Sequence, residues 1–102
     1  MTIPDSVTSI GYMAFSCCGS LTSVTIPDSV TSIGYSAFES CSSLTSVVIG
    51  DSVTSIRDSA FDGCSSLTTV YYTGSVVDWA KISIGSFNSD LTNARIIYNY
   101  VP

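Results

Sequence analysis

The side chains with the greatest capacity for chemistry in this 102-residue chain are its four cysteines. Cys18, Cys41 and Cys64 recur at an interval of 23 residues, and Cys17 is an additional thiol beside the first of them. A zinc site needs ligands at short paired spacings such as Cys-x-x-Cys, which the chain lacks. Identical side chains in a parallel stack point the same way, so we expect the three periodic thiols to be small buried groups that stay reduced. We expect Cys17 to face away from the core and to be the site of any oxidation or intermolecular disulfide.

Three carboxylates, Asp5, Asp28 and Asp51, recur at the same interval. Calcium could bridge such a ladder, but the spacing of acidic ligands found in calcium-binding loops is absent. We therefore expect each carboxylate to accept a hydrogen bond from a backbone amide in the turn of its own repeat. No metal ion or other cofactor is predicted.

The chain offers almost nothing for acid–base or nucleophilic catalysis. It contains no histidine to activate its many serines. Lys81 is its only lysine, and the nearby Ser83 and Ser86 lie in no motif typical of Ser-Lys catalysis. We expect no enzyme activity.

Both ladders belong to a 23-residue repeat that runs without insertion or deletion. A unit this short cannot enclose a core alone and must bury its apolar side against identical neighbours, so the period predicts a solenoid. We call each turn of that solenoid a rung. Three further sets of residues hold the same phase: Ile3, Ile26, Ile49 and Tyr72; Phe15, Phe38 and Phe61; Leu21, Leu44 and Leu67.

Each unit ends in a pattern of the form Leu-x-x-Val-x-Ile, whose alternation of apolar and polar residues is typical of a strand. Stacked one period apart, these strands should form a parallel sheet with Val and Ile inward. The outward positions are the candidate ligand-binding face, with Tyr71 as the best candidate for an exposed aromatic residue. That face consists of Ser23, Thr25, Ser46, Val48, Thr69 and Tyr71.

The rest of each unit should form the opposite wall and one corner of the solenoid. The Ser-Val-Thr-Ser-Ile segments at 6–10, 29–33 and 52–56 predict a second set of short extended stretches. Gly11 and Gly34 then allow a tight corner. The Ala-Phe-x-x-Cys segments at 14–18, 37–41 and 60–64 predict one turn of α- or 3₁₀-helix with Ala, Phe and Cys facing the core.

The repeat, Ile-Pro-Asp-Ser-Val-Thr-Ser-Ile-Gly-x-x-Ala-Phe-x-x-Cys-Ser-Ser-Leu-Thr-Ser-Val, resembles the leucine-rich repeat of BspA-like surface proteins. The segment 71–98 also resembles the one that closes many such arrays. The resemblance implies a single domain, 1–102, with three leucine-rich repeats at 3–72 and a C-terminal capping segment at 73–102. It further implies a parallel sheet on one side of a solenoid, with short strands and helical or 3₁₀ turns on the other. Such proteins are reported on bacteria and some protozoan parasites, where several are linked to adhesion to host matrix proteins, host cells or other microbes.

The composition restricts the possible partners. The chain has three Lys and Arg residues and eight Asp and Glu residues. This excess of negative charge argues against binding to nucleic acid or to an anionic membrane surface. No apolar stretch approaches the ~20 residues of a membrane span, so no membrane insertion is expected. Only 11% of the residues are charged, so Ser and Thr must cover most of the surface.

We expect a non-catalytic scaffold for recognition of a protein or glycan, with adhesion at a cell surface, or after secretion, implied by the resemblance. A structural spacer within a larger surface protein is the competing interpretation, favoured by the uniform Ser and Thr faces. An intracellular protein-binding regulator is a third, because no export signal opens the sequence. The chain begins in the middle of a repeat, which favours a piece of a longer array.

The two ends of the array carry separate expectations. Trp79 and Tyr72 should pack under the capping segment and not on an exposed platform. At the other end, the first rung repeats the interior pattern and lacks the polar outer face usual in terminal repeats. We therefore expect a homodimer through the N-terminal rung, in which the open strand edges and apolar cross-section of two copies meet.

Overall fold

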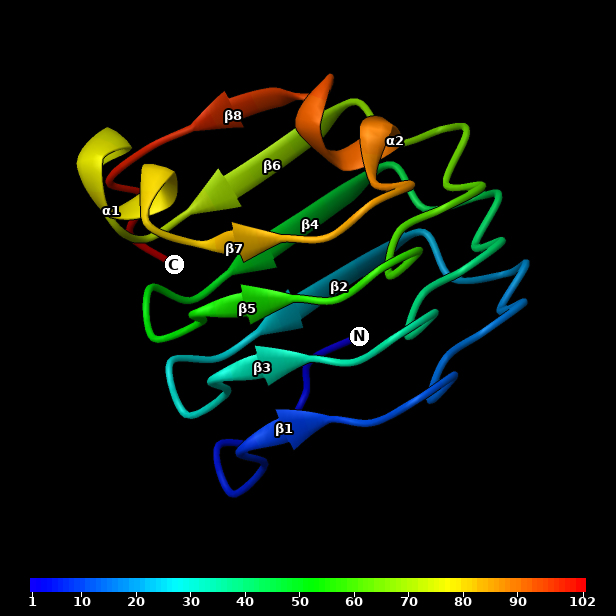
Figure 1. Ribbon diagram of the computed structural model, residues 1–102, viewed down its shortest axis with the longest axis horizontal. Helices are drawn as coiled ribbons and strands as arrows, with labels where there is room; N and C mark the ends of the chain where they lie inside the picture. Colours follow the sequence, from blue (N-terminus) through cyan, green and yellow to red (C-terminus); the bar gives the residue numbers. More distant parts are fainter.

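The two extended segments of each repeat form two parallel sheets that face each other across the core (Figure 1). The computed structural model describes residues 1–102. The long sheet contains β2 (Ser23–Ile26), β4 (Ser46–Ile49), β6 (Thr69–Tyr72) and β8 (Arg95–Ile97). The short sheet contains β1 (Ser9–Ile10), β3 (Ser32–Ile33), β5 (Ser55–Ile56) and β7 (Ser83–Ile84).

The register of both sheets follows the sequence period. Ser23 lies opposite Ser46, and Ser46 lies opposite Thr69, so equivalent residues of successive rungs are neighbours. In the short sheet, Ser9 lies opposite Ser32 in the same way. The predicted parallel solenoid is confirmed, although its second wall is shorter than the five-residue segments suggested.

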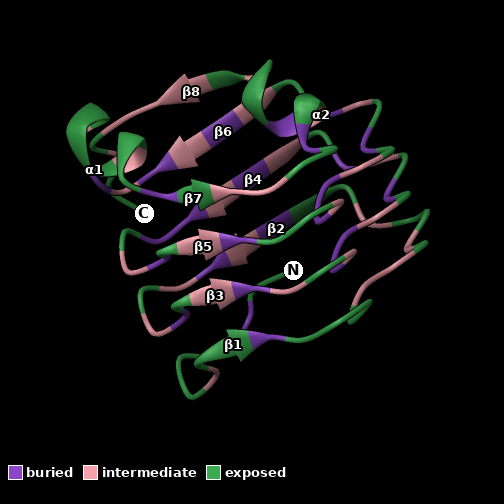
Figure 2. Ribbon diagram, in the orientation of Figure 1, coloured by how far each residue is buried: buried purple, intermediate pink, exposed green.

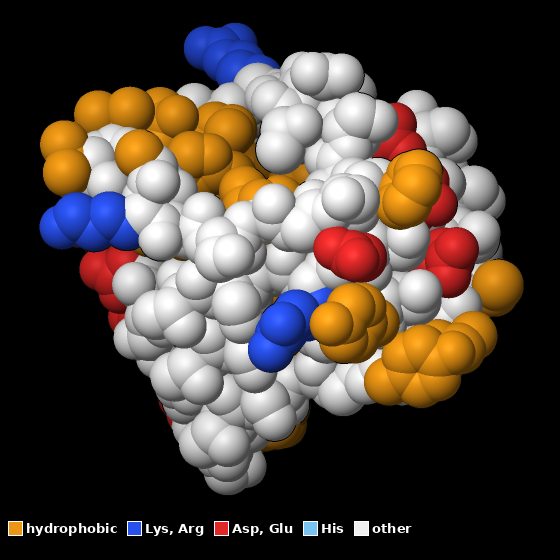
Figure 3. Space-filling view, viewed as in Figure 1, with side chains coloured by type: hydrophobic (Ala, Val, Ile, Leu, Met, Phe, Trp, Pro, Cys, Tyr) orange, Lys and Arg blue, Asp and Glu red, His pale blue; other side chains and the backbone are white.

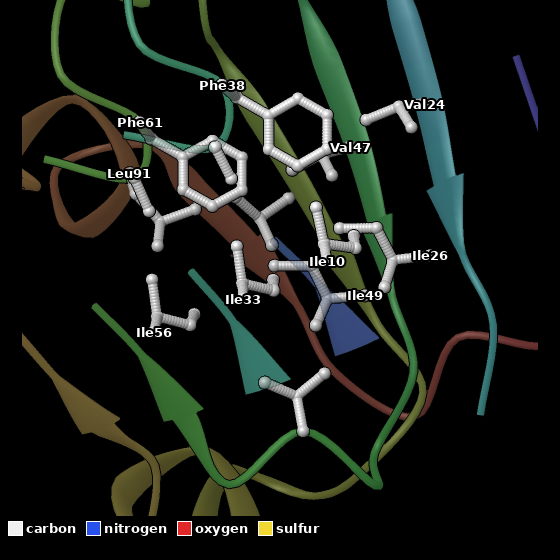
Figure 4. Close-up of a cluster of buried hydrophobic side chains, with 14 of the residues drawn as sticks. Ile10, Val24, Ile26, Ile33, Phe38, Val47, Ile49, Ile56, Phe61 and Leu91 are labelled. Carbon is white, nitrogen blue, oxygen red and sulfur yellow. The ribbon is translucent and has the colours of Figure 1, made fainter. Parts of the chain in front are cut away.

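The core lies between the sheets and is filled by the periodic apolar residues. In each long strand the burial alternates as the sequence predicts, with Val47 and Ile49 fully buried (Figure 2). Phe38 and Phe61 stack almost in parallel, with ring centroids 5.2 Å apart (Figure 4). Phe15 stacks on Phe38 at the same 5.2 Å. A continuous column of identical side chains therefore joins the rungs.

The Ala-Phe-x-x-Cys segments place their side chains inward, but they form successive tight turns and not a regular helical turn. Backbone N–H groups bond to the carbonyl three residues earlier, as from Cys41 to Phe38 at 3.3 Å. One residue within each segment and the residue just before it adopt the left-handed conformation, which prevents a right-handed helix from forming. These residues are Met13, Cys17, Ser36, Ser40, Ser59 and Gly63, with φ between 56° and 76°.

Two rungs approach closely at the corner after β3, where Gly34 lies. A Cβ atom on Gly34 would lie 2.8 Å from the carbonyl oxygen of Ile10 and 2.9 Å from the carbonyl carbon of Gly11. Arg57 occupies the equivalent position of the next rung.

Residues after β6 leave the repeat pattern and close the array. α1 (Val76–Ala80) begins at Ser75, whose hydroxyl accepts from the Asp78 amide while the Asp78 carboxylate accepts from the Ser75 amide. α2 (Ser89–Thr92) contributes the fully buried Leu91. Tyr72 is buried and meets the half-buried Trp79 edge to face, with ring centroids 5.0 Å apart. Neither α1 nor α2 has the length or the apolar character needed to cross a membrane.

Candidate recognition surface

The outer face of the long sheet presents side chains in two straight rows, because the register preserves the repeat phase. One row joins Ser23, Ser46, Thr69 and Arg95, and the other joins Thr25, Val48, Tyr71 and Ile97. Among the six residues predicted to form this face, Ser23 is exposed and the others are half-buried. The structure therefore brings all six together on one surface.

The fourth strand of this face was not anticipated. β8 adds Arg95 and Ile97 to the ends of the two rows. Its register places Arg95 opposite Thr69, a separation of 26 residues and not the 23 of the repeat. A search for the exact period therefore misses it, and the only local signal is the pair of β-branched residues Ile96 and Ile97.

Tyr71 is less accessible than expected because the C-terminal segment folds back beside it. The ring of Tyr100 lies 4.8 Å from the ring of Tyr71 at an angle of 46°. The segment is fixed by backbone bonds from the Tyr100 amide to the Tyr72 carbonyl, 3.0 Å, and from the Asn99 amide to the Gly74 carbonyl, 2.8 Å. Tyr71 thus belongs to a two-ring cluster beside its row.

A groove of about 390 Å³ lies where the long strands end, next to the outer face. Thr25 and Val48 belong to both the groove and the outer face. The C-terminal residue, Pro102, lines it from the other side. Hydroxyl and carboxylate groups provide its polar atoms, from Thr2, Asp5, Asp28 and Thr73.

Only one member of the aspartate ladder accepts hydrogen bonds, and it does so between rungs, which corrects the expectation of bonds within each rung. Oδ1 of Asp28 accepts from the amide of Asp51 in the next rung at 3.2 Å, and from the Thr73 hydroxyl at 3.4 Å, because the stacked rungs bring these donors within reach. The carboxylates of Asp5 and Asp51 accept no hydrogen bond from the protein. No three Cys, Asp or Glu side chains are grouped so as to hold a metal ion.

Of the three periodic thiols, Cys41 and Cys64 are buried as predicted, whereas Cys18 in the first rung is only half-buried. The Cys41 thiol donates to the Phe15 carbonyl and the Cys64 thiol donates to the Phe38 carbonyl, both at 3.2 Å. Burial raises the pKa of the Cys41 thiol, and it raises the pKa of the Cys64 thiol to about 12. Cys17 is exposed.

Threonine hydroxyls also bond from rung to rung. The Thr45 hydroxyl donates to the Thr22 carbonyl at 3.0 Å, and the Thr68 hydroxyl donates to the Thr45 carbonyl at 3.1 Å. The other wall has the same arrangement, with the Thr31 and Thr54 hydroxyls each donating at 3.2 Å to the threonine carbonyl one rung earlier. These hydroxyl protons are therefore committed to the scaffold and are not free to bind a ligand.

Asn88 ends the column of phenylalanines in a way that the sequence did not reveal. In the earlier rungs the amides of Phe15 and Phe38 donate to the alanine carbonyl of the following rung, at 2.7 Å. The Phe61 amide donates to Oδ1 of Asn88 instead, at 2.9 Å. Nδ2 of the same side chain donates to the Arg57 carbonyl at 3.0 Å and to the Gly85 carbonyl at 3.1 Å. Asn88 thus replaces the backbone groups of the missing next rung.

Known proteins resemble the chain in sequence and in structure. The family described as "BspA type Leucine rich repeat region (6 copies)" matches residues 1–99. The crystal structure of the T. pallidum leucine-rich repeat protein TpLRR is 28% identical with a TM-score of 0.67. The match covers 71% of this chain and 39% of that chain, so this chain spans less than half of the length of that relative.

A second crystal structure, a leucine-rich cell surface protein from Faecalibacterium prausnitzii A2-165, is 29% identical with a TM-score of 0.47. This match covers 81% of our chain and 34% of the F. prausnitzii protein. No curated protein gives a significant match to the sequence. The repeat, its parallel register and the family match over 1–99 lead to one conclusion: this chain belongs to the BspA-type leucine-rich repeat family.

Proposed function

We propose that this chain is a non-catalytic scaffold that recognises a protein or glycan through the outer face of its long sheet, as part of adhesion at a cell surface. The observation that carries the proposal is the row Thr25, Val48, Tyr71 and Ile97, in which four strands hold their side chains in register. Such a row offers several small aligned contacts that are ordered before binding, which lowers the entropy lost on association. Membership of the BspA-type leucine-rich repeat family, whose repeat resembles that of surface proteins, supports the location.

The groove beside this row supports recognition of an extended ligand. Its hydroxyl and carboxylate groups can bond to the hydroxyls of a sugar or to the amides of a peptide. Val48 lies at the boundary between groove and face, so a ligand that spans both must contact it.

The test is a screen of the purified domain against matrix proteins and glycans, followed by the variant Val48→Asp with the best ligand. A buried charge without a partner in the interface should weaken binding at least about fivefold, since leaving such a group unpaired costs about 1–3 kcal/mol or more. Val77→Asp is the matched control, because Val77 is 61% exposed on α1, away from the sheet face. Equal binding by both variants would remove the sheet face from consideration.

A structural spacer is the second candidate, favoured by the threonine ladders that tie each rung to the next. A spacer should bind no ligand selectively in the same screen, and its function should depend only on its length. Replacing Val48 and Tyr71 in the full-length protein would then leave adhesion unchanged, whereas deleting one repeat would alter it.

A further inference from the structure

A second surface carries more exposed aromatic side chains than the long sheet does. It follows the turns after β1, β3, β5 and β7, and Figure 3 shows hydrophobic and charged side chains side by side along one edge of the molecule. Tyr12 is 72% exposed, Phe87 71%, Tyr35 48% and Met13 45%. We call these four residues, with Arg57 and Asp58, the turn edge.

The backbone holds Tyr12 and Tyr35 at equivalent places in adjacent rungs. The Met13 amide donates to the Tyr35 carbonyl at 3.0 Å, and the Ser36 amide donates to the Asp58 carbonyl at 3.1 Å. The two tyrosines are therefore offset by one rung, about 4.8 Å. Their presentation is fixed by the scaffold and not by a mobile loop.

Only one of these tyrosines has a cation over its ring. The Arg57 guanidinium carbon lies 5.6 Å from the centre of the Tyr35 ring, which is the geometry of a cation–π contact. Arg57 comes from the rung that follows Tyr35. The residue equivalent to Arg57 in the rung that follows Tyr12 is Gly34, which has no side chain to offer.

The place over Tyr12 receives no side chain from the next rung. Gly34 occupies there the position that Arg57 holds one rung later, so no guanidinium reaches the Tyr12 ring. The exposed Tyr12 ring is therefore equivalent to the Tyr35 ring, which holds the Arg57 guanidinium, but no cation of the chain lies over Tyr12.

The charge of the two rungs that follow Tyr12 favours a cationic ligand, because their turns carry three carboxylates and one arginine. The turns that carry the two tyrosines and Arg57 also carry Glu39, Asp58 and Asp62, and the chain as a whole has a net charge of −5. Asp58 is exposed, while Glu39 and Asp62 are half-buried. These carboxylates raise the local concentration of a positively charged partner and oppose an acidic one.

We propose that the turn edge is a second interaction surface, which binds an arginine- or lysine-bearing segment of a partner protein with one cationic group over Tyr12. The contact reproduces, between two molecules, the one that Arg57 makes with Tyr35 within the chain. The proposal does not depend on the long-sheet face, because the two surfaces share no residue.

The experiment is an NMR titration of the amide-labelled domain with a short peptide of alternating arginine and glycine, beside a peptide of alternating glutamate and glycine. Chemical-shift changes are expected at the amides of Gly11, Tyr12 and Met13 with the arginine peptide only. Tyr12→Leu should weaken binding about two- to fivefold, the equivalent of an exposed cation–π contact, whereas Tyr12→Phe should keep it.

A gain-of-binding variant makes the test sharper. Arg57→Ala should free the Tyr35 ring and add shifts at Tyr35 and Ser36 with the arginine peptide. The double variant Arg57→Ala with Tyr35→Leu separates the ring from the change in charge, and it should lose those added shifts. Equal affinity for Tyr12→Leu and the parent, or equal shifts with the glutamate peptide, would overturn the proposal. Shifts confined to β2, β4 and β6 would overturn it as well, while supporting the long-sheet face.

Discussion

Asn88 is the single polar side chain that is buried in this structure, with 3% of its surface exposed. We predict that Asn88→Ala lowers the free energy of unfolding by about 2–4 kcal/mol. The change leaves the Phe61 amide and the Gly85 carbonyl without partners, and the Arg57 carbonyl keeps only its bond from the Ala60 amide. Urea denaturation measures the change. Asn93→Ala is the matched control, since Asn93 is exposed and its side chain makes no hydrogen bond to the protein. Similar losses in the two variants would contradict the role of Asn88 as a substitute for the next rung.

The buried thiols should make the protein sensitive to alkaline pH. Burial raises the pKa of Cys64 from 9.0 to about 12, so the folded state keeps a proton that the unfolded state loses. Its contribution to stability is complete below pH 9 and is lost as the pH rises toward about 12. Between these pH values, this one thiol should lower the free energy of unfolding by about 1.4 kcal/mol per pH unit.

Unfolding curves at pH values on both sides of 9.0 test the alkaline effect. Cys41 and Tyr72, whose pKa values burial also raises, should contribute in the same direction. Cys64→Ala should show a shallower decline than the parent, while Cys17→Ser should follow the parent closely. A stability that is constant across this range would show that the thiol is hydrated in the folded protein.

At the scale of elements, α1 holds Trp79 over the C-terminal end of the core. Trp79→Ala should lower the free energy of unfolding by about 3 kcal/mol, near the lower limit for a buried aromatic because the indole is half-buried. Val77→Ala, on the exposed side of the same helix, should change it little. Thermal unfolding followed by circular dichroism measures both. A melting temperature for Trp79→Ala within a degree or two of the parent would show that the indole does not stabilise Tyr72.

The elements that repeat were predictable, and those that occur once were not. The long strands and the phenylalanine column follow from the period, because every rung must satisfy the same packing. The left-handed residues, such as Met13 and Ser36, carry no signal of their own, since glycine is the usual choice at positive φ. β8, Asn88 and the contact of Tyr100 with Tyr71 depend on tertiary contacts within a segment that repeats nothing. The six residues of the sheet face were identifiable from alternation, whereas the turn edge emerged only from the exposure of Tyr12 and Tyr35.

For the whole molecule, the two ends of the solenoid differ. Phe15, Val7 and Leu21 in the first rung are half-buried, while Phe38, Val30 and Leu44 in the second rung are fully buried. A cavity of about 210 Å³ at this end is lined largely by apolar residues, including Ile3 and Ile10. We propose that two copies meet there, and we predict a molar mass that rises with concentration in light scattering. Phe15→Glu should favour the monomer, and a parent that stays monomeric at hundreds of micromolar would contradict the prediction.

The way in which Asn88 ends the column has a consequence for how such a chain can change over generations. Its side chain contacts only backbone groups, and the amides of Phe15 and Phe38 are placed to make the same bond. The closing segment is therefore compatible with any rung that ends in this turn. An in-frame duplication or loss of one whole unit, by unequal recombination between the near-identical repeats, would leave both termini with the neighbours they need. The length of the solenoid can therefore change by whole repeats while the same capping segment closes it.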